Sequence, residues 1–128
     1  MHACVFVTAR VHMSVADAED ARLPRAYEVS LEVDGSVDTP ALLSYMRDKH
    51  IPEIGATGCF MHIDFAQTGA HTYRTRYVAP TQAALNEYLE KHAPAFKADF
   101  VAHFPAGGIS VTRVVWTVQQ TWTFPASG

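Results

Sequence analysis

Residues 26–34 alternate strictly between apolar and polar side chains. Tyr27, Val29, Leu31 and Val33 stand against Glu28, Ser30, Glu32 and Asp34. Side chains of a strand point to opposite faces in turn, so this pattern predicts a strand with one buried face. The stretches 59–67 and 71–79 alternate in the same way, with Gly69 between them, and we expect them to form a hairpin.

Proline and capping residues place helices between these strands. Thr39-Pro40 is a typical helix start, and the residue before Pro52 resists the helical conformation, so the first helix should end near Ile51. Pro80-Thr81 opens a second helix, which Pro94 should break. A short third helix over 93–104 and a β-branched strand over 109–122 follow.

The resulting order from residue 26 is β-α-β-β-α-(α)-β. This is the ferredoxin-like split βαβ arrangement, an α+β fold with an antiparallel four-stranded sheet and helices on one face. We therefore expect one such domain over 26–122, a C-terminal tail over 123–128, and an N-terminal extension over 1–25. In that extension, residues 3–13 alternate well enough for an extra strand, and the polar residues 14–25 suggest a linker or loop.

Composition excludes several classes of partner. The 128 residues are 48% apolar and 18% charged, which is enough material for a packed core. The net charge is −3 and the basic residues are scattered, which argues against nucleic-acid binding. No apolar stretch approaches the length of a membrane span, and two cysteines make no disulfide framework. We expect a soluble, cytoplasmic protein.

The polar face of the predicted sheet admits two interpretations. It could simply face water, or two such sheets could pack together as a symmetric homodimer around a partly enclosed polar interior. An interior of that kind could hold a small ligand. The candidate ligand-binding residues carry balanced charges and are Glu28, Glu32, Asp64, Arg74 and Arg76, with either Arg113 or Thr112 beside them, depending on the register of the last strand.

His50 is the first candidate for acid–base chemistry. Its angular position around the predicted helix is close to that of Leu43 and Met46, so it should lie on the inward side. It could equally bond a free carbonyl at its own helix end. His62, on the polar face, is the second candidate.

Metal and cofactor sites are not indicated. His62, Asp64 and His71 could share a metal ion, but they lack the spacing of known metal motifs. Cys59 is isolated and is best interpreted as a buried, inert thiol. Haem would need an axial histidine in an apolar pocket, and His62 beside Phe60 is the one hint of this. We therefore predict no metal and no cofactor.

Several motifs in order resemble those of a small, mainly bacterial family of unknown function. They are "HIPEI" (50–54), "ATGCF" (56–60), Tyr73, "RY" (76–77) and "HAP" (92–94), and the resemblance spans about 26–118. That family is similar to the dimeric α+β barrel superfamily, which implies a homodimer whose two sheets enclose a barrel. The superfamily includes cofactor-free monooxygenases, a haem-degrading branch, isomerases, dehydratases and members with only regulatory roles. Its EthD-like branch has a similar "H.P" pattern, which His50 and Pro52 match.

The function expected from these observations is binding of a small organic molecule in a polar barrel interior. If the protein is an enzyme, His50 or His62 would move a proton and Arg74 and Arg76 would stabilise an anion. That chemistry would be cofactor-free and of the EthD-like or monooxygenase-like kind. The alternative is a structural or regulatory dimer without catalysis, in which the charges are interface pairs.

Overall fold

Four strands form one antiparallel sheet in the order β2-β3-β1-β4. The computed structural model describes residues 14–127. The strands are β1 (Arg25–Val33), β2 (His62–Gly69), β3 (Thr72–Ala79) and β4 (Ile109–Thr117). This sheet and the order of its elements confirm the predicted ferredoxin-like α+β fold.

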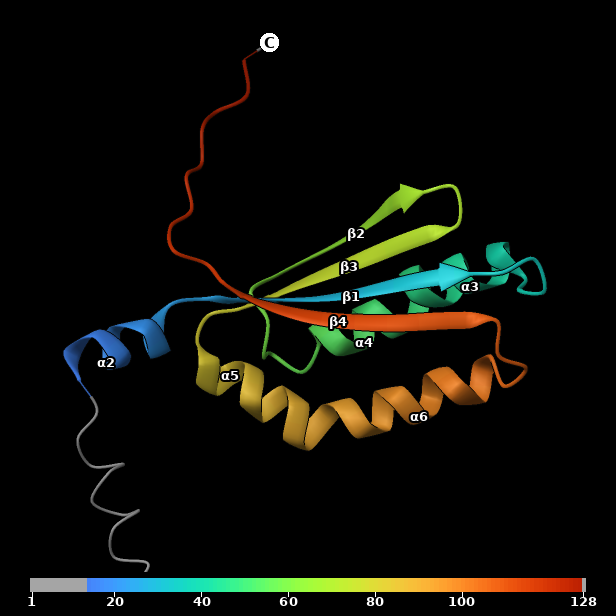
Figure 1. The fold of residues 1–128 in the computed structure, drawn as a ribbon, viewed down its shortest axis with the longest axis horizontal. Helices are drawn as coiled ribbons and strands as arrows, with labels where there is room; N and C mark the ends of the chain where they lie inside the picture. Colours follow the sequence, from blue (N-terminus) through green and yellow to red (C-terminus); the bar gives the residue numbers. More distant parts are fainter. Residues whose placement is uncertain (1–13, 128) are drawn as a thin grey trace, which may run out of the picture.

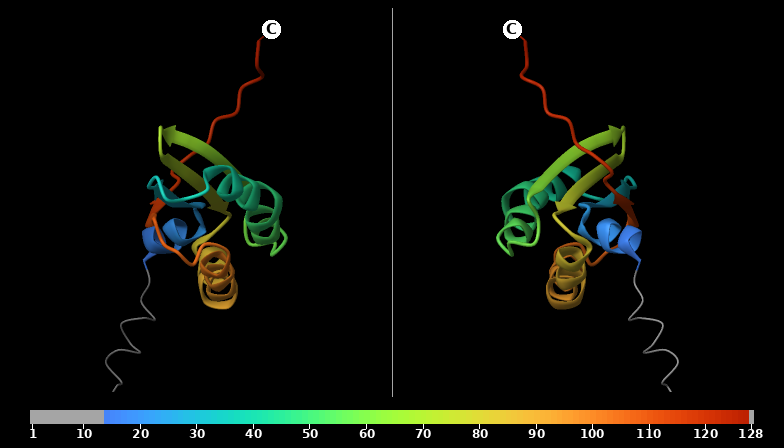
Figure 2. Two further views of the ribbon diagram at one scale, coloured as in Figure 1. Left: turned by 90° about the vertical axis from the view of Figure 1, so that its right-hand side faces the viewer. Right: turned by 90° about the vertical axis from the view of Figure 1, so that its left-hand side faces the viewer.

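Two long helical segments cover one face of the sheet (Figures 1 and 2). The first comprises α3 (Thr39–Tyr45), η1 (Met46–His50) and α4 (Ile51–Gly55). The second comprises α5 (Gln82–Glu87), η2 (Tyr88–His92) and α6 (Ala93–His103). None of the helices in the described part of the chain combines the length and the apolar character needed to cross a bilayer. The opposite side of the sheet is called the open face below.

The core lies between the helices and the sheet. The alternation in β1 places Tyr27, Leu31 and Val33 on the buried side, each no more than 5% exposed. Tyr73 and Tyr77 of β3 are buried on the same side, since they lie opposite Leu31 and Tyr27. Ile63 and Phe65 of β2 also pack against the core, whereas Met61, which the alternation over 59–67 would place beside them, precedes β2 and is 62% exposed.

Both helical segments continue past the prolines that were expected to end them. Each has a π-helical turn just before its proline: the Ile51 N–H bonds to the Met46 carbonyl, and the Ala93 N–H bonds to the Tyr88 carbonyl. A proline inside an α-helix clashes with the carbonyl four residues earlier. The wider turn relieves that conflict, so the predicted helix ends near Ile51 and at Pro94 were wrong.

The two segments also correspond in sequence. Residues 39–52 and 81–94 align without gaps, and both contain an acidic residue, then Lys-His, any residue, and Pro. The identical pairs are Thr39/Thr81, Ala41/Ala83, Leu43/Leu85, Lys49/Lys91, His50/His92 and Pro52/Pro94. In both copies the histidine is the last residue of the π-helical turn. The correspondence is confined to the two helical segments.

Residues 15–22 form a helix, α2 (Val15–Arg22), where a loop was expected. The segment has no apolar stripe, so its pattern does not predict a helix. The Ser14 side chain caps it by accepting from the Asp17 N–H, and the buried Arg25 bonds to Asp20 at 2.9 Å. Arg25 also donates to Gln82, which ties the end of α2 to α5. The extra strand expected at 3–13 lies outside the described residues.

β4 is shorter than the strand predicted over 109–122. Its pairing with β1 ends at Arg25 opposite Thr117, and the Val118 N–H bonds to the Pro24 carbonyl. Beyond this point the neighbouring strand offers no further partner. The residues from 119 to 127 therefore run away from the body as an extended segment (Figure 1), with Trp122 and Phe124 exposed.

Gly107 and Gly108 join α6 to β4 and provide a matched pair for substitution. Both have φ of +83°, which strains any other residue. A Cβ on Gly108 would lie 2.7 Å from Asp34 Oδ1, whereas one on Gly107 would meet nothing within 4 Å. We expect Gly107→Ala to lower the free energy of unfolding by about 1–2 kcal/mol. Gly108→Ala should cost roughly 1–3 kcal/mol more, because it also overpacks the site. Urea unfolding of both variants measures the difference. Equal losses in the free energy of unfolding would show that the close contact between the new Cβ at position 108 and Asp34 costs nothing.

Candidate functional site

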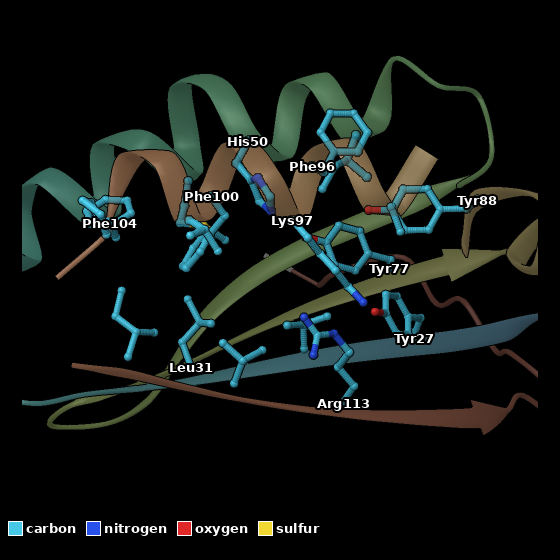
Figure 3. A pocket seen from close by; sticks show the side chains of 18 of the residues that line it. Tyr27, Leu31, His50, Tyr77, Tyr88, Phe96, Lys97, Phe100, Phe104 and Arg113 are labelled. Carbon is cyan, nitrogen blue, oxygen red and sulfur yellow. The ribbon is translucent and has the colours of Figure 1, made fainter. Parts of the chain in front are cut away.

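A cavity of about 390 Å³ lies between the helical layer and the sheet. Its walls come from β1, β3 and β4 on one side and from η1, α4 and α6 on the other (Figure 3). Most of the lining is apolar, with Leu31 and Val111 from the sheet and Phe96, Phe100 and Phe104 from the helix. Ligand pockets in proteins commonly have this size and this mainly apolar lining.

His50 lies at this cavity, on the inward side of the helix as its position in the sequence predicted. Its ring stacks on Tyr45, with centroids 5.3 Å apart, and meets Phe96 and Phe100 edge to face. The helical segment continues past His50 into α4, and the imidazole makes no side-chain capping bond there. The imidazole is therefore held by aromatic neighbours and is not a helix cap.

A short chain of hydrogen bonds determines the tautomer of His50. The Tyr45 hydroxyl donates to Asp99 Oδ2 at 2.7 Å, and His50 Nδ1 lies 3.3 Å from the same hydroxyl oxygen. A hydroxyl has a single proton to donate, so Nδ1 must supply the proton in its contact with Tyr45. In neutral His50 the proton therefore sits on Nδ1, and Nε2 is an acceptor with no hydrogen-bond partner among the described residues.

Electrostatics keep His50 neutral. Burial lowers the pKa of its imidazole from 6.5 to about 4, and the Lys49 charge acts in the same direction. The carboxylates of Asp99 and Glu53 oppose this fall. Asp99 itself has a lowered pKa, because Tyr45 and Lys49 donate hydrogen bonds to it. At neutral pH the site thus contains an ionised Asp99 and a neutral imidazole.

Tyr45→Phe tests this hydrogen-bond chain. Without the hydroxyl, Nδ1 of His50 loses its acceptor, and we expect the imidazole to become a mixture of tautomers. Histidine side-chain nitrogen NMR reports this directly. The lost bond to Asp99 should lower the free energy of unfolding by roughly 1–3 kcal/mol. Tyr73→Phe alters another buried tyrosine and should leave the His50 signals unchanged. An unchanged His50 signal in Tyr45→Phe would contradict the assignment.

Three tyrosines bring polar groups to the cavity wall: Tyr27, Tyr77 and Tyr88. They pack together, with Tyr27 5.9 Å from Tyr77 and 6.3 Å from Tyr88 between ring centroids. Burial raises the pKa of Tyr77 and Tyr88 above the usual value, while the Arg113 charge acts in the opposite direction. The hydroxyls of Tyr77 and Tyr88 are therefore protonated at neutral pH and can donate to a ligand.

Two cations, Lys97 of α6 and Arg113 of β4, also line the cavity. Arg113 lies opposite Val29, so it shares the helix-covered side of the sheet. Thr112, opposite Ser30, takes the place on the open face, which settles the choice that the sequence left undecided. Figure 3 shows Lys97 and Arg113 reaching toward the same region beside Tyr27. Sequence reasoning did not identify Arg113 as a cavity residue, because the register of β4 was unknown.

The predicted polar face forms an ion-pair network on the open face, on the other side of the sheet from this cavity. Arg74 bonds to Asp64 at 2.7 Å and lies 3.8 Å from Glu28, and Arg76 lies 3.6 Å from Glu28. His62 Nε2 lies 3.4 Å from Asp64, and its side chain is 60% exposed. The structure thus brings four of the five predicted ligand-binding residues together with His62, and separates them all from His50.

The fifth predicted residue, Glu32, lies outside that network and forms no ion pair with any residue in the range 14–127. The ion pairs of the network on the open face are partly exposed, and pairs that water can reach contribute little to stability individually. The exposure of His62 is also unlike the enclosed apolar pocket that axial ligation of haem requires.

The potential metal ligands that lie close together are not the ones considered from the sequence. Among residues 14–127, the ligand atoms of Cys59, Glu87 and His92 lie within 4.8 Å of one another. The set considered from the sequence was His62, Asp64 and His71, which do not form such a group in the described part of the chain. Cys59 is buried, as expected, and Glu87 also pairs with Lys91.

Comparison with known proteins identifies a family and a fold. The family model described as "Domain of unknown function (DUF4286)" matches residues 25–118. A search of curated proteins found none that matches this chain.

Several solved structures are similar in fold. The cofactor-independent oxygenase SnoaB from Streptomyces nogalater is 14% identical, with a TM-score of 0.58, over 77% of this chain and 95% of that one. A protein from Bacillus halodurans described as an EthD family protein is 9% identical, with a TM-score of 0.58, over 74% of this chain and 99% of that one. A dimeric ferredoxin-like protein from an uncultured marine organism is 11% identical, with a TM-score of 0.57, over 78% and 99%. At these identities the likeness shows the fold alone, and it agrees with the superfamily that the sequence motifs resemble.

Proposed function

Because this chain belongs to the DUF4286 family, whose description states no function, we propose a function from the cavity itself. The protein binds a small organic molecule between helices and sheet, and His50 accepts a proton from it. One observation carries this proposal: Nε2 of a neutral imidazole faces an apolar cavity, while Nδ1 is held by the Tyr45–Asp99 pair. A base oriented by a hydroxyl and a carboxylate is a recurrent arrangement for proton transfer.

The remaining wall residues suit this chemistry. The tyrosine hydroxyls can donate to the oxygen on which negative charge develops when a proton leaves. The aromatic side chains packed on His50 reduce its contact with water, which strengthens such interactions. No step needs a cofactor, and the fold is shared with a cofactor-independent oxygenase, which supports the proposal by analogy only.

Hydrogen–deuterium exchange of simple aromatic carbon acids tests the proposal. Phenylacetone and benzoylacetone are small and carry weakly acidic C–H groups, and proton NMR in deuterated buffer follows their exchange. We expect the wild-type protein to accelerate exchange of at least one probe, and His50→Gln to reduce that acceleration by about 100-fold or more. His62→Gln, on the open face, should retain it.

Two results would overturn the proposal: no acceleration of either probe by the wild type, or equal acceleration by His50→Gln.

Native mass spectrometry of the purified protein adds an independent measurement. A small organic molecule retained by the folded chain, and lost when the cavity is blocked by Val111→Trp, would support binding at this place. Retention by Val111→Trp would place it elsewhere.

The assembly proposed is a homodimer formed through the open face. That face combines charges of both signs with exposed apolar side chains: Trp116, which is 55% exposed, donates to Glu28 at 3.1 Å, and Val114 lies beside it. Two copies could pair these charges reciprocally. A ferredoxin-like neighbour of similar fold is described as dimeric.

Light scattering at micromolar concentration should give the dimer mass, and Trp116→Lys should shift it toward the monomer. A monomeric wild type would contradict the dimer.

A further inference from the structure

We infer that the molecule bound in this cavity is an anion with an aromatic body, and that Lys97 and Arg113 recognise its acidic group. This inference deepens the proposed function and rests on it. It concerns the class of ligand, which neither the family description nor the similar structures specify for this chain.

The charge of the cavity is the first observation. Its described lining includes one lysine and one arginine but no aspartate or glutamate, although the whole chain has a net charge of −3. His50 adds no charge in its neutral form. The cavity is therefore a positively charged region within an acidic protein, and electrostatic complementarity favours an anion there.

The lack of ion-pair partners for these cations is the second observation. Elsewhere, Arg25, Lys49, Arg74, Arg76 and Lys91 each lie within 4 Å of a carboxylate. Within residues 14–127, Lys97 and Arg113 form no ion pair; Arg22 and Arg47 form none either, but they lie outside the cavity. Both cavity cations are exposed to solvent. They nevertheless extend from opposite walls toward one place (Figure 3), where their charges repel each other. An anion between them would relieve that repulsion and bond to both.

The walls around the two cations define the rest of the ligand. Phe96 and Phe100 come from α6 and Phe104 follows its end, and Val29, Leu31 and Val111 face them from the sheet. Aromatic side chains favour aromatic partners through edge-to-face and offset stacking. The Tyr27 hydroxyl beside the cations provides a further donor for an oxyanion. These groups together suit a carboxylate, sulfonate or acidic enol attached to a ring.

Orientation follows from the same geometry. His50 projects into the cavity from η1, Lys97 from α6 and Arg113 from β4 (Figure 3). With its acidic group held by the cations beside Tyr27, a ligand would direct another part of its body toward His50. Lys97 and Arg113 would then position the ligand, and His50 would act on it.

Two fluorescent probes with the same frame test the inference. 8-Anilino-1-naphthalenesulfonate carries an acidic group, and N-phenyl-1-naphthylamine is the same frame without it. We expect the wild type to bind the sulfonate about tenfold or more tightly than the neutral probe. The Lys97→Met/Arg113→Met double variant should lose that preference while binding the neutral probe within about twofold of wild type. Higher salt should weaken sulfonate binding, because exposed charges are screened.

A matched double variant controls for overall charge. Arg47→Met/Lys91→Met removes two positive charges outside the cavity and should keep the preference for the sulfonate. Shifts of the His50 side-chain NMR signals confirm that each probe enters the cavity. Equal affinity of wild type for the two probes, or an unchanged preference in the Lys97/Arg113 variant, would overturn this inference and leave the proposed function standing. If neither probe shifts the His50 NMR signals, both this inference and the proposed function fail.

Discussion

Acidification from pH 6.5 to pH 4 is expected to lower the free energy of unfolding by up to about 3 kcal/mol through His50 alone. Burial depresses the pKa of the folded-state imidazole to about 4, whereas the unfolded chain titrates near 6.5. Between these values the unfolded state binds a proton that the folded state does not, so stability falls as the pH falls. Well above pH 6.5 His50 is neutral in both states and contributes no pH dependence.

Urea unfolding at several pH values, with His50→Gln as the variant, isolates this contribution. Glutamine does not titrate, so the variant should lose less stability than the wild type over this interval. His71→Gln removes an exposed histidine and should follow the wild-type curve. Parallel curves for wild type and His50→Gln would show that the imidazole is not desolvated. The result bears on function, because it measures the protonation equilibrium of the imidazole that is proposed to accept the proton.

Ile54→Ala is expected to lower the free energy of unfolding by about 2–5 kcal/mol, the usual range for truncating a buried isoleucine. Ile54 is 1% exposed and packs against Tyr27, Tyr77 and Leu85 in the core. It also lines the cavity, so its truncation enlarges the space beside the tyrosines. Affinity for the neutral naphthylamine probe should therefore change along with stability.

Val101→Ala is the matched control for that truncation. Val101 also lines the cavity, but it is 62% exposed and has little packing to lose. Its substitution should change the free energy of unfolding by less than about 0.5 kcal/mol. Equal losses for the two variants would mean that Ile54 does not anchor α4 to the sheet. Chemical denaturation at neutral pH measures both.

The elements that depend on local pattern were predicted well. The alternation in β1 specified both a strand and its buried side, because the period of two is a property of the backbone. The inward position of His50 followed in the same way from the helical period. Prediction failed at Pro52 and Pro94, because a proline rule based on α-helical geometry does not anticipate π-helical turns.

The remaining differences between sequence and structure are non-local. The helix α2 has no apolar stripe, and Arg25 holds it by bonding both to Asp20 and to Gln82, which is 57 residues further along the chain. Arg113 and Thr112 are neighbours in a strand, and a shift of one residue in pairing exchanges their faces. The structure places Arg113 on the cavity side through pairing with β1, a strand about eighty residues earlier in the chain.

The sequence by itself thus determined the ferredoxin-like order of elements, the buried side of the sheet and the family motifs around "HIPEI". The tertiary structure decided where the chemistry can occur. It placed the predicted charges Glu28, Asp64, Arg74 and Arg76 in a network on the open face, and it brought His50, Tyr45 and Asp99 together at a cavity on the other side. The physical reason is that periodicity is encoded locally, whereas strand register and helix packing join residues that are distant in the chain.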